Sequence, residues 1–127
     1  MAQGKAKQLY NRRVGAWGEA LAADYLSAKG YEILGRNIRT PAGEIDLIVR
    51  KGPLLSFVEV KTRRSTSFGP PEEAITAAKQ QRMADAAELW LTDHPEEKGD
   101  WQLDVVAIWI KPGMQEPEIV HLEGELD

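Results

Sequence analysis

Apolar residues recur along the chain with two different spacings, and each spacing predicts a type of element. From about Arg12 to Lys29 they recur every three or four positions, as in a helix with one buried face, and Gly30 provides a stop. A second helix with the same spacing is predicted to begin between Glu72 and Thr76. It ends at His94-Pro95, because a residue before proline disfavours the helical conformation.

Five segments have the alternating or short β-branched pattern of strands. They cover Tyr31 to Arg39, Glu44 to Arg50, Leu54 to Lys61, Asp100 to Ile110 and Glu118 to Leu122. The order α-β-β-β-α-β-β predicts an α/β fold in which helices flank a mixed central β-sheet. The second helix is expected to cross over the sheet, so that the strand from Trp101 to Ile110 runs parallel to an earlier strand.

The chain of 127 residues is long enough to bury a core, and we expect one domain over residues 1–127, with residues 1–10 as a flexible basic arm. Its 43% hydrophobic and 28% charged residues are typical of a soluble globular protein. It has no cysteine and no run of about 18 apolar residues, which excludes disulfides, cysteine-ligated zinc and a membrane-spanning helix. Because the polar N-terminus does not resemble a signal peptide, we expect a cytoplasmic location.

Charge is distributed unevenly along the chain. Residues 1–82 carry 14 Lys and Arg against 8 Asp and Glu, whereas residues 83–127 carry 2 against 12, so the overall charge of −4 hides a basic part. This distribution is compatible with a phosphate-binding face made by the first part. From charge alone, a solvated surface with an acidic end is the simpler interpretation.

Four charged residues lie in the predicted hairpin. Side chains in a strand alternate between faces, so Glu44 and Asp46 share a face of one strand. Glu59 and Lys61 share a face of the next. A turn of two residues, Gly52-Pro53, or of four places Asp46 directly opposite Glu59, with Cβ atoms about 4.5–5.5 Å apart. An odd number of turn residues sends the two carboxylates to opposite faces.

Two facing carboxylates repel each other, more strongly beside apolar neighbours such as Ile48 and Phe57, so a cation is expected there. Lys61 supplies one positive charge, and oxygen ligands of this kind suit Mg²⁺ or Mn²⁺. The same side chains also fit a structural cross-strand ion pair, the more common role on an arbitrary hairpin. Placing charged groups at the end of an apolar strand costs free energy. Their presence there therefore favours the interpretation that they have a function.

The hairpin resembles a known family. Gly43-Glu-Ile-Asp-Leu-Ile followed by Phe57-Val-Glu-Val-Lys-Thr-Arg63 is similar to the YraN family of bacterial proteins. That family resembles archaeal Holliday junction resolvases and belongs to the PD-(D/E)xK nuclease superfamily. The resemblance covers about residues 12–110 and implies a restriction-endonuclease-like fold. The proline of the superfamily name is Ile45 here, at a position that provides no metal ligand.

The resemblance implies a role for the acidic residues and for the lysine of the motif. Asp46 and Glu59 would bind Mg²⁺ or Mn²⁺, and Lys61 would orient or activate the attacking water. Glu19 on the first helix would complete the metal site. Its helical neighbours are small and include two glycines, which predicts the close approach of another backbone or of a substrate. Without the resemblance, an exposed helical glutamate is an equally good interpretation of Glu19.

Basic residues near the hairpin are candidates for contacts with the phosphates of a nucleic acid. They are Arg36, Arg39, Arg63, Arg64, Lys79 and Arg82. Taken singly, each is also an ordinary surface charge.

Four further residues receive structural interpretations. Asp104 begins an apolar strand, where a capping or ion-pair role is expected, and neither His94 nor His121 is expected to be catalytic. Burial is the expectation for Trp17, with stacking on nucleic-acid bases as the alternative.

These features together predict metal-dependent hydrolysis of phosphodiester bonds by an endonuclease without base-sequence specificity. We expect it to act on DNA rather than RNA, branched DNA included. The alternative is an accessory domain that binds nucleic acid with weak or no catalysis, and a third interpretation is a protein-interaction domain acting through the acidic C-terminal third. Resolvase-like proteins work as symmetric dimers, so a homodimer is a further expectation from the resemblance. The sequence itself does not establish it.

Overall fold

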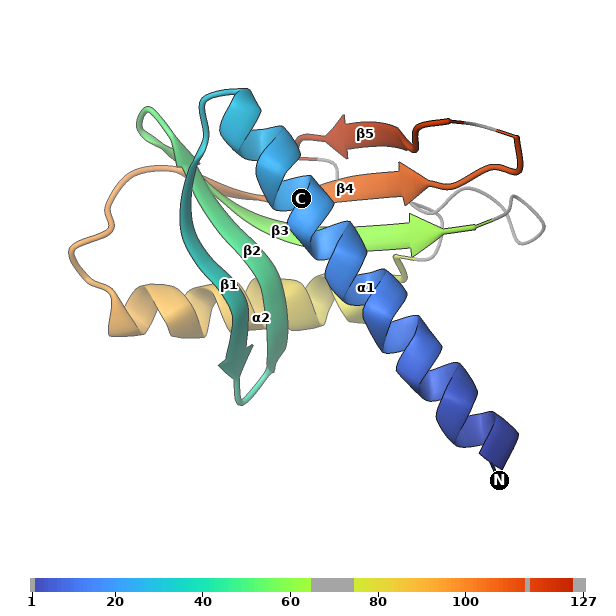
Figure 1. The fold of residues 1–127 in the computed structure, drawn as a ribbon. Helices are drawn as coiled ribbons and strands as arrows, with labels where there is room; N and C mark the ends of the chain where they lie inside the picture. The colour runs from blue at the N-terminus through green and yellow to red at the C-terminus, as the bar shows by residue number, and fades with distance from the viewer. Residues whose placement is uncertain (1, 65–74, 114, 125–127) are drawn as a thin grey trace.

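The structure, a computed structural model, describes residues 2–64, 75–113 and 115–124. Within them the chain forms two helices and five strands in the predicted order (Figure 1). The elements are α1 (Ala2–Ala28), β1 (Glu32–Thr40), β2 (Gly43–Lys51), β3 (Leu54–Arg63), α2 (Ala77–Asp93), β4 (Trp101–Trp109) and β5 (Glu118–Leu122). The α-β-β-β-α-β-β prediction is confirmed, and the mixed sheet with its two helices is consistent with a restriction-endonuclease-like fold.

The strands form one sheet in which sequence neighbours lie side by side, in the order β1-β2-β3-β4-β5. Adjacent strands are antiparallel except β3 and β4, which are parallel. Their pairing runs from Leu55 opposite Trp101 to Arg63 opposite Trp109. α2 connects these two strands because a parallel pair cannot be joined by a tight turn, which confirms the predicted crossover.

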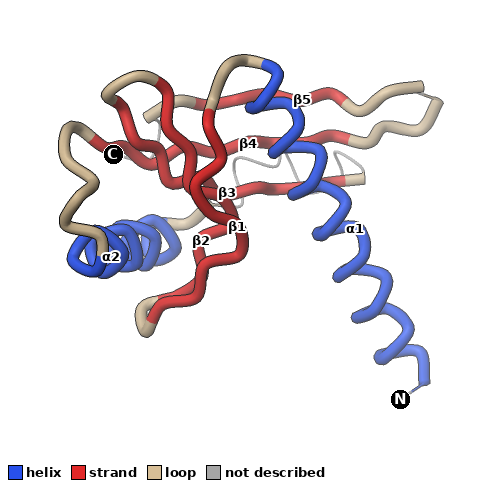
Figure 2. Tube along the Cα trace, turned by 60° about the vertical axis from the view of Figure 1, so that its left-hand side comes forward, coloured by secondary structure: helices blue, strands red, loops and turns tan. Residues whose placement is uncertain are grey.

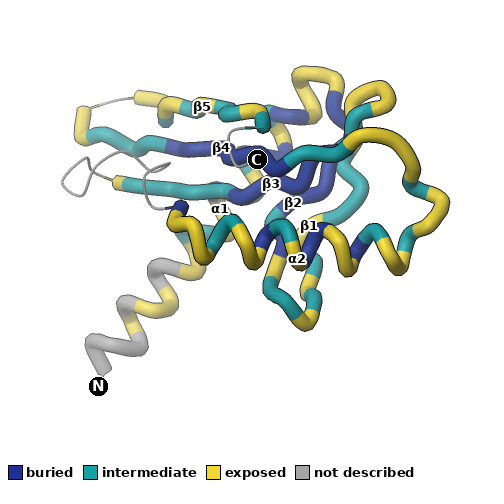
Figure 3. The backbone as a smooth tube through the Cα atoms, turned by 180° about the vertical axis from the view of Figure 1, so that it is seen from behind, coloured by how far each residue is buried: buried dark blue, intermediate teal, exposed yellow. Residues whose placement is uncertain are grey.

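The two helices cover opposite faces of the sheet (Figure 2). Neighbouring residues of β3 show this alternation: Phe57 belongs to the apolar cluster with α2, and Val58 to the cluster with α1. Most residues of β2, β3 and β4 are therefore buried (Figure 3). Among the described residues, Ser56, Glu59 and Asp104 are the buried polar ones, and such residues need a partner or a function.

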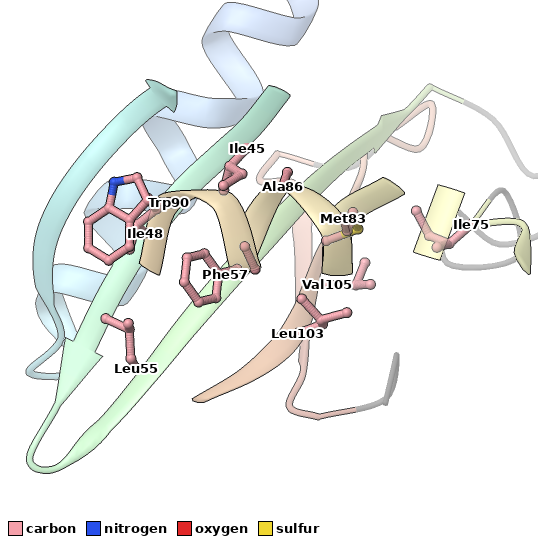
Figure 4. Packing of buried hydrophobic residues seen from close by; sticks show 11 residues of the cluster. Ile45, Ile48, Leu55, Phe57, Ile75, Met83, Ala86, Trp90, Leu103 and Val105 are labelled. Atoms are coloured by element: carbon pink, nitrogen blue, oxygen red, sulfur yellow. The ribbon is translucent and has the colours of Figure 1, made fainter. Parts of the chain in front are cut away.

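Aromatic packing holds α2 on its face of the sheet (Figure 4). The Phe57 ring makes edge-to-face contacts with Trp90 of α2, with centroids 5.7 Å apart, and with Trp101 of β4, 5.6 Å apart. Each such pair stabilises the fold by about 0.5–1.5 kcal/mol beyond the area it buries. Trp90 also stacks on His94, the C-cap of α2, so the helix ends where the sequence predicts.

α1 packs on the other face through small residues. Ala22 and Leu26 have no exposed surface. A Cβ atom added to Gly18 would lie 2.1 Å from Thr62 Oγ1, which confirms that this glycine permits the close approach of β3. No such approach of the described chain is seen at Gly15, where nothing lies within 4 Å of an added Cβ atom; the approach of a substrate there stays a prediction.

α1 corrects two predictions. The helix starts at Ala2 rather than near Arg12, so the backbone of residues 2–10, predicted as a flexible arm, is helical. That segment is rich in alanine, lysine and glutamine, which favour helices, and its first turns project away from the sheet (Figure 1). Trp17, predicted to be buried, has 42% of its surface exposed.

α2 begins at Ala77, after an N-cap at Thr76 whose hydroxyl accepts the backbone N–H of Lys79 at 3.2 Å. The helix was expected to begin between Glu72 and Thr76. Residues 72–74 lie outside the described residues, so only the cap can be compared with that prediction. In the part of the chain that the structure describes, neither helix has the length and apolar character needed to cross a membrane.

Candidate functional site

The turn between β2 and β3 consists of two residues, Gly52-Pro53, and sets the geometry of the site. Gly52 has a φ of 59°, in the left-handed region that glycine adopts without steric cost. The resulting register pairs Ile48 with Phe57, and both belong to the cluster with α2. By strand alternation, Asp46 and Glu59 are placed on this same face, as an even-numbered turn predicts.

β2 and β3 separate beside these carboxylates. Their pairing ends at Leu47 and Val58, so Asp46 and Glu59 do not form the directly opposed pair that the sequence predicts. Instead, Asp46 Oδ2 accepts the backbone N–H of Val60 at 2.8 Å. We call the opening between the two strands beyond Leu47 and Val58 the fork, and the Asp46 side chain lies in it.

Asp46 lines a cavity on each side of the fork. The cavity between α2 and the hairpin measures about 310 Å³ and is lined by Gly43, Glu44, Asp46, Glu59, Lys79, Arg82 and Met83. A smaller cavity of about 100 Å³ opens toward α1 and is lined by Ala16, Glu19, Ala20, Arg36, Asn37, Asp46 and Leu47. Residues of both helices therefore approach one carboxylate, although the helices cover opposite faces of the sheet.

Glu59 lies between two lysines. Its Oε1 is 3.0 Å from Nζ of Lys79 on α2 and 3.8 Å from Nζ of Lys61 on its own strand. Glu59 is only 8% exposed, so these ammonium groups provide the charge compensation that a buried carboxylate requires. Lys61 was expected here, whereas Lys79 was expected to contact phosphates or to close the site.

The carboxylates of the fork change one another's proton affinity. Burial raises the pKa of Asp46, and the negative charges of Glu59 and Glu19 raise it further, to about 8, although the hydrogen bond from Val60 acts in the opposite direction. Without additional positive charge, Asp46 is therefore largely protonated at neutral pH. A cation placed between these carboxylates would favour the ionised form.

Glu19 reaches the fork from α1. Burial raises its pKa, and the negative charges of Glu44 and Glu59 add to this effect. With the Asn37 amide oriented so that its nitrogen faces the carboxylates, it donates to Glu19 Oε2 at 2.8 Å and to Glu44 Oε1 at 3.1 Å. Asn37 has a φ of 50°, a conformation that asparagine tolerates better than most residues.

Asn37 and Glu44 were absent from the predicted site residues. Strand alternation places Glu44 on the face of Asp46, so the sequence carried a signal for it. No comparable signal marks Asn37, because its role depends on the pairing of β1 with β2 and on the position of α1.

Comparisons with known proteins place this site within a family. Residues 18–108 match the profile of the family described as "Uncharacterised protein family UPF0102". A UPF0102 protein of Syntrophomonas wolfei is 50% identical over 103 residues, covering 81% of this chain and 90% of that protein. A UPF0102 protein of Syntrophotalea carbinolica is 44% identical over 114 residues, covering 90% of this chain and 91% of that protein. The chain belongs to the UPF0102 family. This finding agrees with the resemblance to the YraN family, and the matched region includes every carboxylate and lysine of the fork.

The donor set of this UPF0102 chain fits a divalent cation by its charge. In the described residues, no three Asp, Glu or His side chains converge closely enough to hold a metal ion by themselves. Asp46 and Glu59 make two carboxylates, and Mg²⁺ commonly takes one or two from a protein and completes its shell with water and phosphate oxygens. Burial and the negative charges of Glu59 and Glu19 raise the pKa of Asp46, and a bound cation would lower it again. A metal ion would have to share Glu59 with Lys79 or displace the Lys79 ammonium.

The pKa values of the two lysines of the UPF0102 site are shifted in opposite directions. Burial lowers the pKa of Lys61, and the neighbouring Lys79 lowers it further, against the attraction of Glu59. Burial also acts to lower the pKa of Lys79, but its contacts with Lys61 and Glu59 outweigh burial and raise it. The two lysines and the Glu59 carboxylate therefore form one tightly coupled charged group.

The structure brings only some of the predicted basic residues to the fork. Lys79 and Arg82 line the cavity beside α2, and Arg36 lines the cavity beside α1. Arg63 lies close enough to Lys61 for its charge to lower the pKa of that lysine. The other two lie elsewhere: Arg39 lines a cavity between β1 and the C-terminal half of α2, and Arg64 lines a cavity beside Trp17.

Asp104 of the UPF0102 chain has a structural role. It is fully buried and accepts hydrogen bonds from the Gln102 side chain and the Gly124 backbone, both at 2.9 Å. Its Oδ2 lies 2.8 Å from Nε2 of His121, a hydrogen-bond contact that joins β4 to β5.

Proposed function

We propose that this protein hydrolyses phosphodiester bonds in nucleic acid with the help of Mg²⁺ or Mn²⁺, acting as an endonuclease on DNA rather than RNA. The observation that carries the proposal is the fork, where the carboxylates of Asp46 and Glu59 lie together and two lysines approach Glu59. An ion pair that only stabilised the hairpin would need one lysine and one carboxylate. It would not leave Asp46 crowded enough to raise its pKa to about 8.

Asp46 and Glu59 are the residues that would hold the metal ion, with Glu19 near enough to influence it through space. A bound divalent ion supplies charge neutralisation for the scissile phosphate and lowers the pKa of a water molecule. The Val60 N–H holds Asp46 Oδ2 in place, which fixes the orientation of this carboxylate at the fork.

Lys61 is positioned to handle a proton or to stabilise negative charge near Glu59. Burial and the neighbouring Lys79 lower the pKa of Lys61, a direction that suits a lysine that would assist an attacking water molecule. Lys79 and Arg82 line the same cavity as Asp46 and Glu59, and their charges suit the phosphates of the substrate.

The test is incubation of the purified chain with single-stranded, duplex and branched DNA and with RNA, in Mg²⁺, in Mn²⁺ and in chelator. We expect cleavage with metal and none in chelator. Asp46→Asn and Lys61→Ala should each abolish or strongly reduce it. Matched controls are Asp24→Asn and Lys98→Ala, which change exposed residues away from the fork and should cleave like the parent. Absence of cleavage under all conditions would exclude the proposal, as would undiminished cleavage by both fork variants.

One observation favours the alternative of a binding domain without turnover. The Lys79 ammonium lies 3.0 Å from Glu59 Oε1 and already provides a cation at one of the two carboxylates. Under that alternative, nucleic acid binds in a salt-dependent manner, remains uncleaved, and binds equally well to Asp46→Asn and the parent. The cytoplasmic location and a homodimer stay predictions.

A further inference from the structure

A cavity of about 500 Å³ lies on the flank of α1 that faces away from the fork. Its volume is within the range of small-molecule binding sites, about 300–1,000 Å³. Trp17 lines this cavity and Glu19 lines the fork, and two positions on a helix differ by about 200° in direction. The cavity is therefore separate from the proposed reaction site.

Trp17 is the aromatic side chain of this cavity. The residue is 42% exposed, next to Gly18, where α1 touches β3. Val14 and Ile110 add aliphatic surface beside the ring. An exposed indole face in an apolar recess is the arrangement on which nucleic-acid bases stack, and such stacking tolerates any base because every base has a π-face.

The charge of the cavity favours an anionic ligand. Arg13, Arg64 and Lys111 line it, against the single carboxylate of Glu116. Lys111 also lies 3.4 Å from Glu118 and over the Trp109 ring. Cations around an aromatic ring bind a base and its phosphates together, as in proteins that bind single strands.

Consecutive arginines connect this cavity with the fork. Arg63 affects the pKa of Lys61 on one side of β3, while Arg64 lines the cavity beside α1 on the other. The Cα atoms of Lys61 and Arg64 can be at most about 10 Å apart, which equals roughly three nucleotides at a stacked rise of ~3.4 Å. A nucleic-acid segment of that length would therefore be long enough to reach both places.

We propose that this cavity binds an unpaired nucleotide of a nucleic-acid substrate, with the base against Trp17 and phosphates at Arg13 and Arg64. The proposal rests on the proposed function and extends it, because it specifies a substrate with a single-stranded segment close to the scissile bond. Continuous duplex keeps its bases stacked inside the helix and does not place one on Trp17.

Fluorescence anisotropy of a labelled 12-nucleotide oligothymidylate and of a matched duplex, both in chelator, tests the proposal. We expect Trp17→Ala to weaken single-strand binding by about 5- to 150-fold and to leave duplex binding unchanged. Trp17→Phe keeps an aromatic face and should retain most of the affinity. Arg13→Ala should reduce the slope of log K against log salt by about 0.7.

The matched controls are Leu89→Ala, which removes another large apolar residue that is 40% exposed, and Lys98→Ala, which removes an exposed charge. Circular dichroism of each variant establishes that it is folded. Intrinsic tryptophan emission of the parent should fall on addition of the oligonucleotide, and most of that change should be absent in Trp17→Phe. Equal affinity of Trp17→Ala, Leu89→Ala and the parent would overturn the proposal, and so would an equal loss of duplex and single-strand binding.

Binding in chelator and cleavage in Mg²⁺ separate the two proposals. Single-strand binding that depends on Trp17, without cleavage, would overturn the nuclease function and support the cavity. Cleavage that depends on Asp46, with single-strand binding indifferent to Trp17, would overturn the cavity and support the nuclease function.

Discussion

Asp46 Oδ2 accepts the backbone N–H of Val60, at 2.8 Å, at the point where β2 and β3 cease to pair. Because the donor is a backbone group of β3, this hydrogen bond fixes the position of a candidate metal ligand relative to the sheet. It also satisfies a backbone donor at the fork, so one carboxylate serves both the fold and the proposed chemistry. Substitutions at Asp46 can separate these two roles.

Asp46→Ala and Asp46→Asn should differ in stability although both remove the carboxyl group. The asparagine amide oxygen can still accept the Val60 N–H, whereas alanine leaves that donor without its partner. We expect Asp46→Ala to be less stable than Asp46→Asn by about 1–3 kcal/mol, the cost of an unsatisfied buried donor. Urea unfolding of both variants in chelator measures this difference, and equal midpoints and slopes would show that the hydrogen bond contributes nothing.

Stability should fall as pH rises when no metal is present. The folded pKa of Asp46 is raised from 3.8 to about 8, so between these values the folded chain binds a proton that the unfolded chain has released. The contribution is fully present below the unfolded pKa and is lost as pH rises through the folded pKa. The slope can reach about 1.4 kcal/mol per pH unit for one proton. Unfolding between pH 5 and pH 8.5 in chelator should show this decline, and Asp46→Asn should flatten it.

Lys79→Met should weaken the fold in chelator and tighten metal binding. The Lys79 ammonium lies 3.0 Å from Glu59 Oε1, and its side chain is 27% exposed, so its removal should cost about 1–2 kcal/mol. The same change removes the cation that a metal ion would have to displace. Urea unfolding in chelator and titration with Mg²⁺ test the two effects, with Lys98→Met as the control. A variant that loses stability and also binds Mg²⁺ more weakly would show that Lys79 does not compete with the metal.

Gly18→Ala and Gly15→Ala form a matched pair on α1. A Cβ atom at Gly18 would lie 2.1 Å from Thr62 Oγ1, so this substitution should cost about 1–3 kcal/mol. At Gly15 nothing lies within 4 Å, and alanine should stabilise the helix by about 0.5–1 kcal/mol. Thermal and urea unfolding measure both effects.

Adding Thr62→Ala to Gly18→Ala should restore part of the lost stability, because it removes the clashing hydroxyl. The comparison is with Thr62→Ala alone, in a double-mutant cycle. Additive effects would mean that α1 and β3 do not interact through this contact.

The sequence predicted the hairpin and the charged residues that share a face near its end, because these depend on local rules. Strand alternation fixes which side chains share a face, and Gly52-Pro53 supplies a turn that brings Asp46 and Glu59 to the same side. The crossover of α2 was also predictable, since its length suits a parallel connection. The separation of the strands beyond Leu47 was not, because it depends on a side chain replacing backbone pairing.

Trp17 shows the limit of the periodicity argument. Its spacing with other large apolar residues predicts burial, yet α1 approaches β3 through Gly18 and its small neighbours. Close packing favours the face with the smallest side chains, which leaves the indole on the flank with 42% of its surface exposed. Apolar spacing cannot distinguish these two faces without the partner strand.

The sequence alone determined the order of elements and the types of charged residue near the end of the central hairpin, whereas the structure decided its register. Only the tertiary structure decided that Lys79, Glu19 and Asn37 meet at the fork, since they come from three elements that local pairing does not relate. Side-chain directions repeat every two residues in a strand and every 3.6 residues in a helix. The sequence alone therefore predicts which side chains share a face. Convergence of distant segments is set by how the helices pack on the sheet, which no local period encodes.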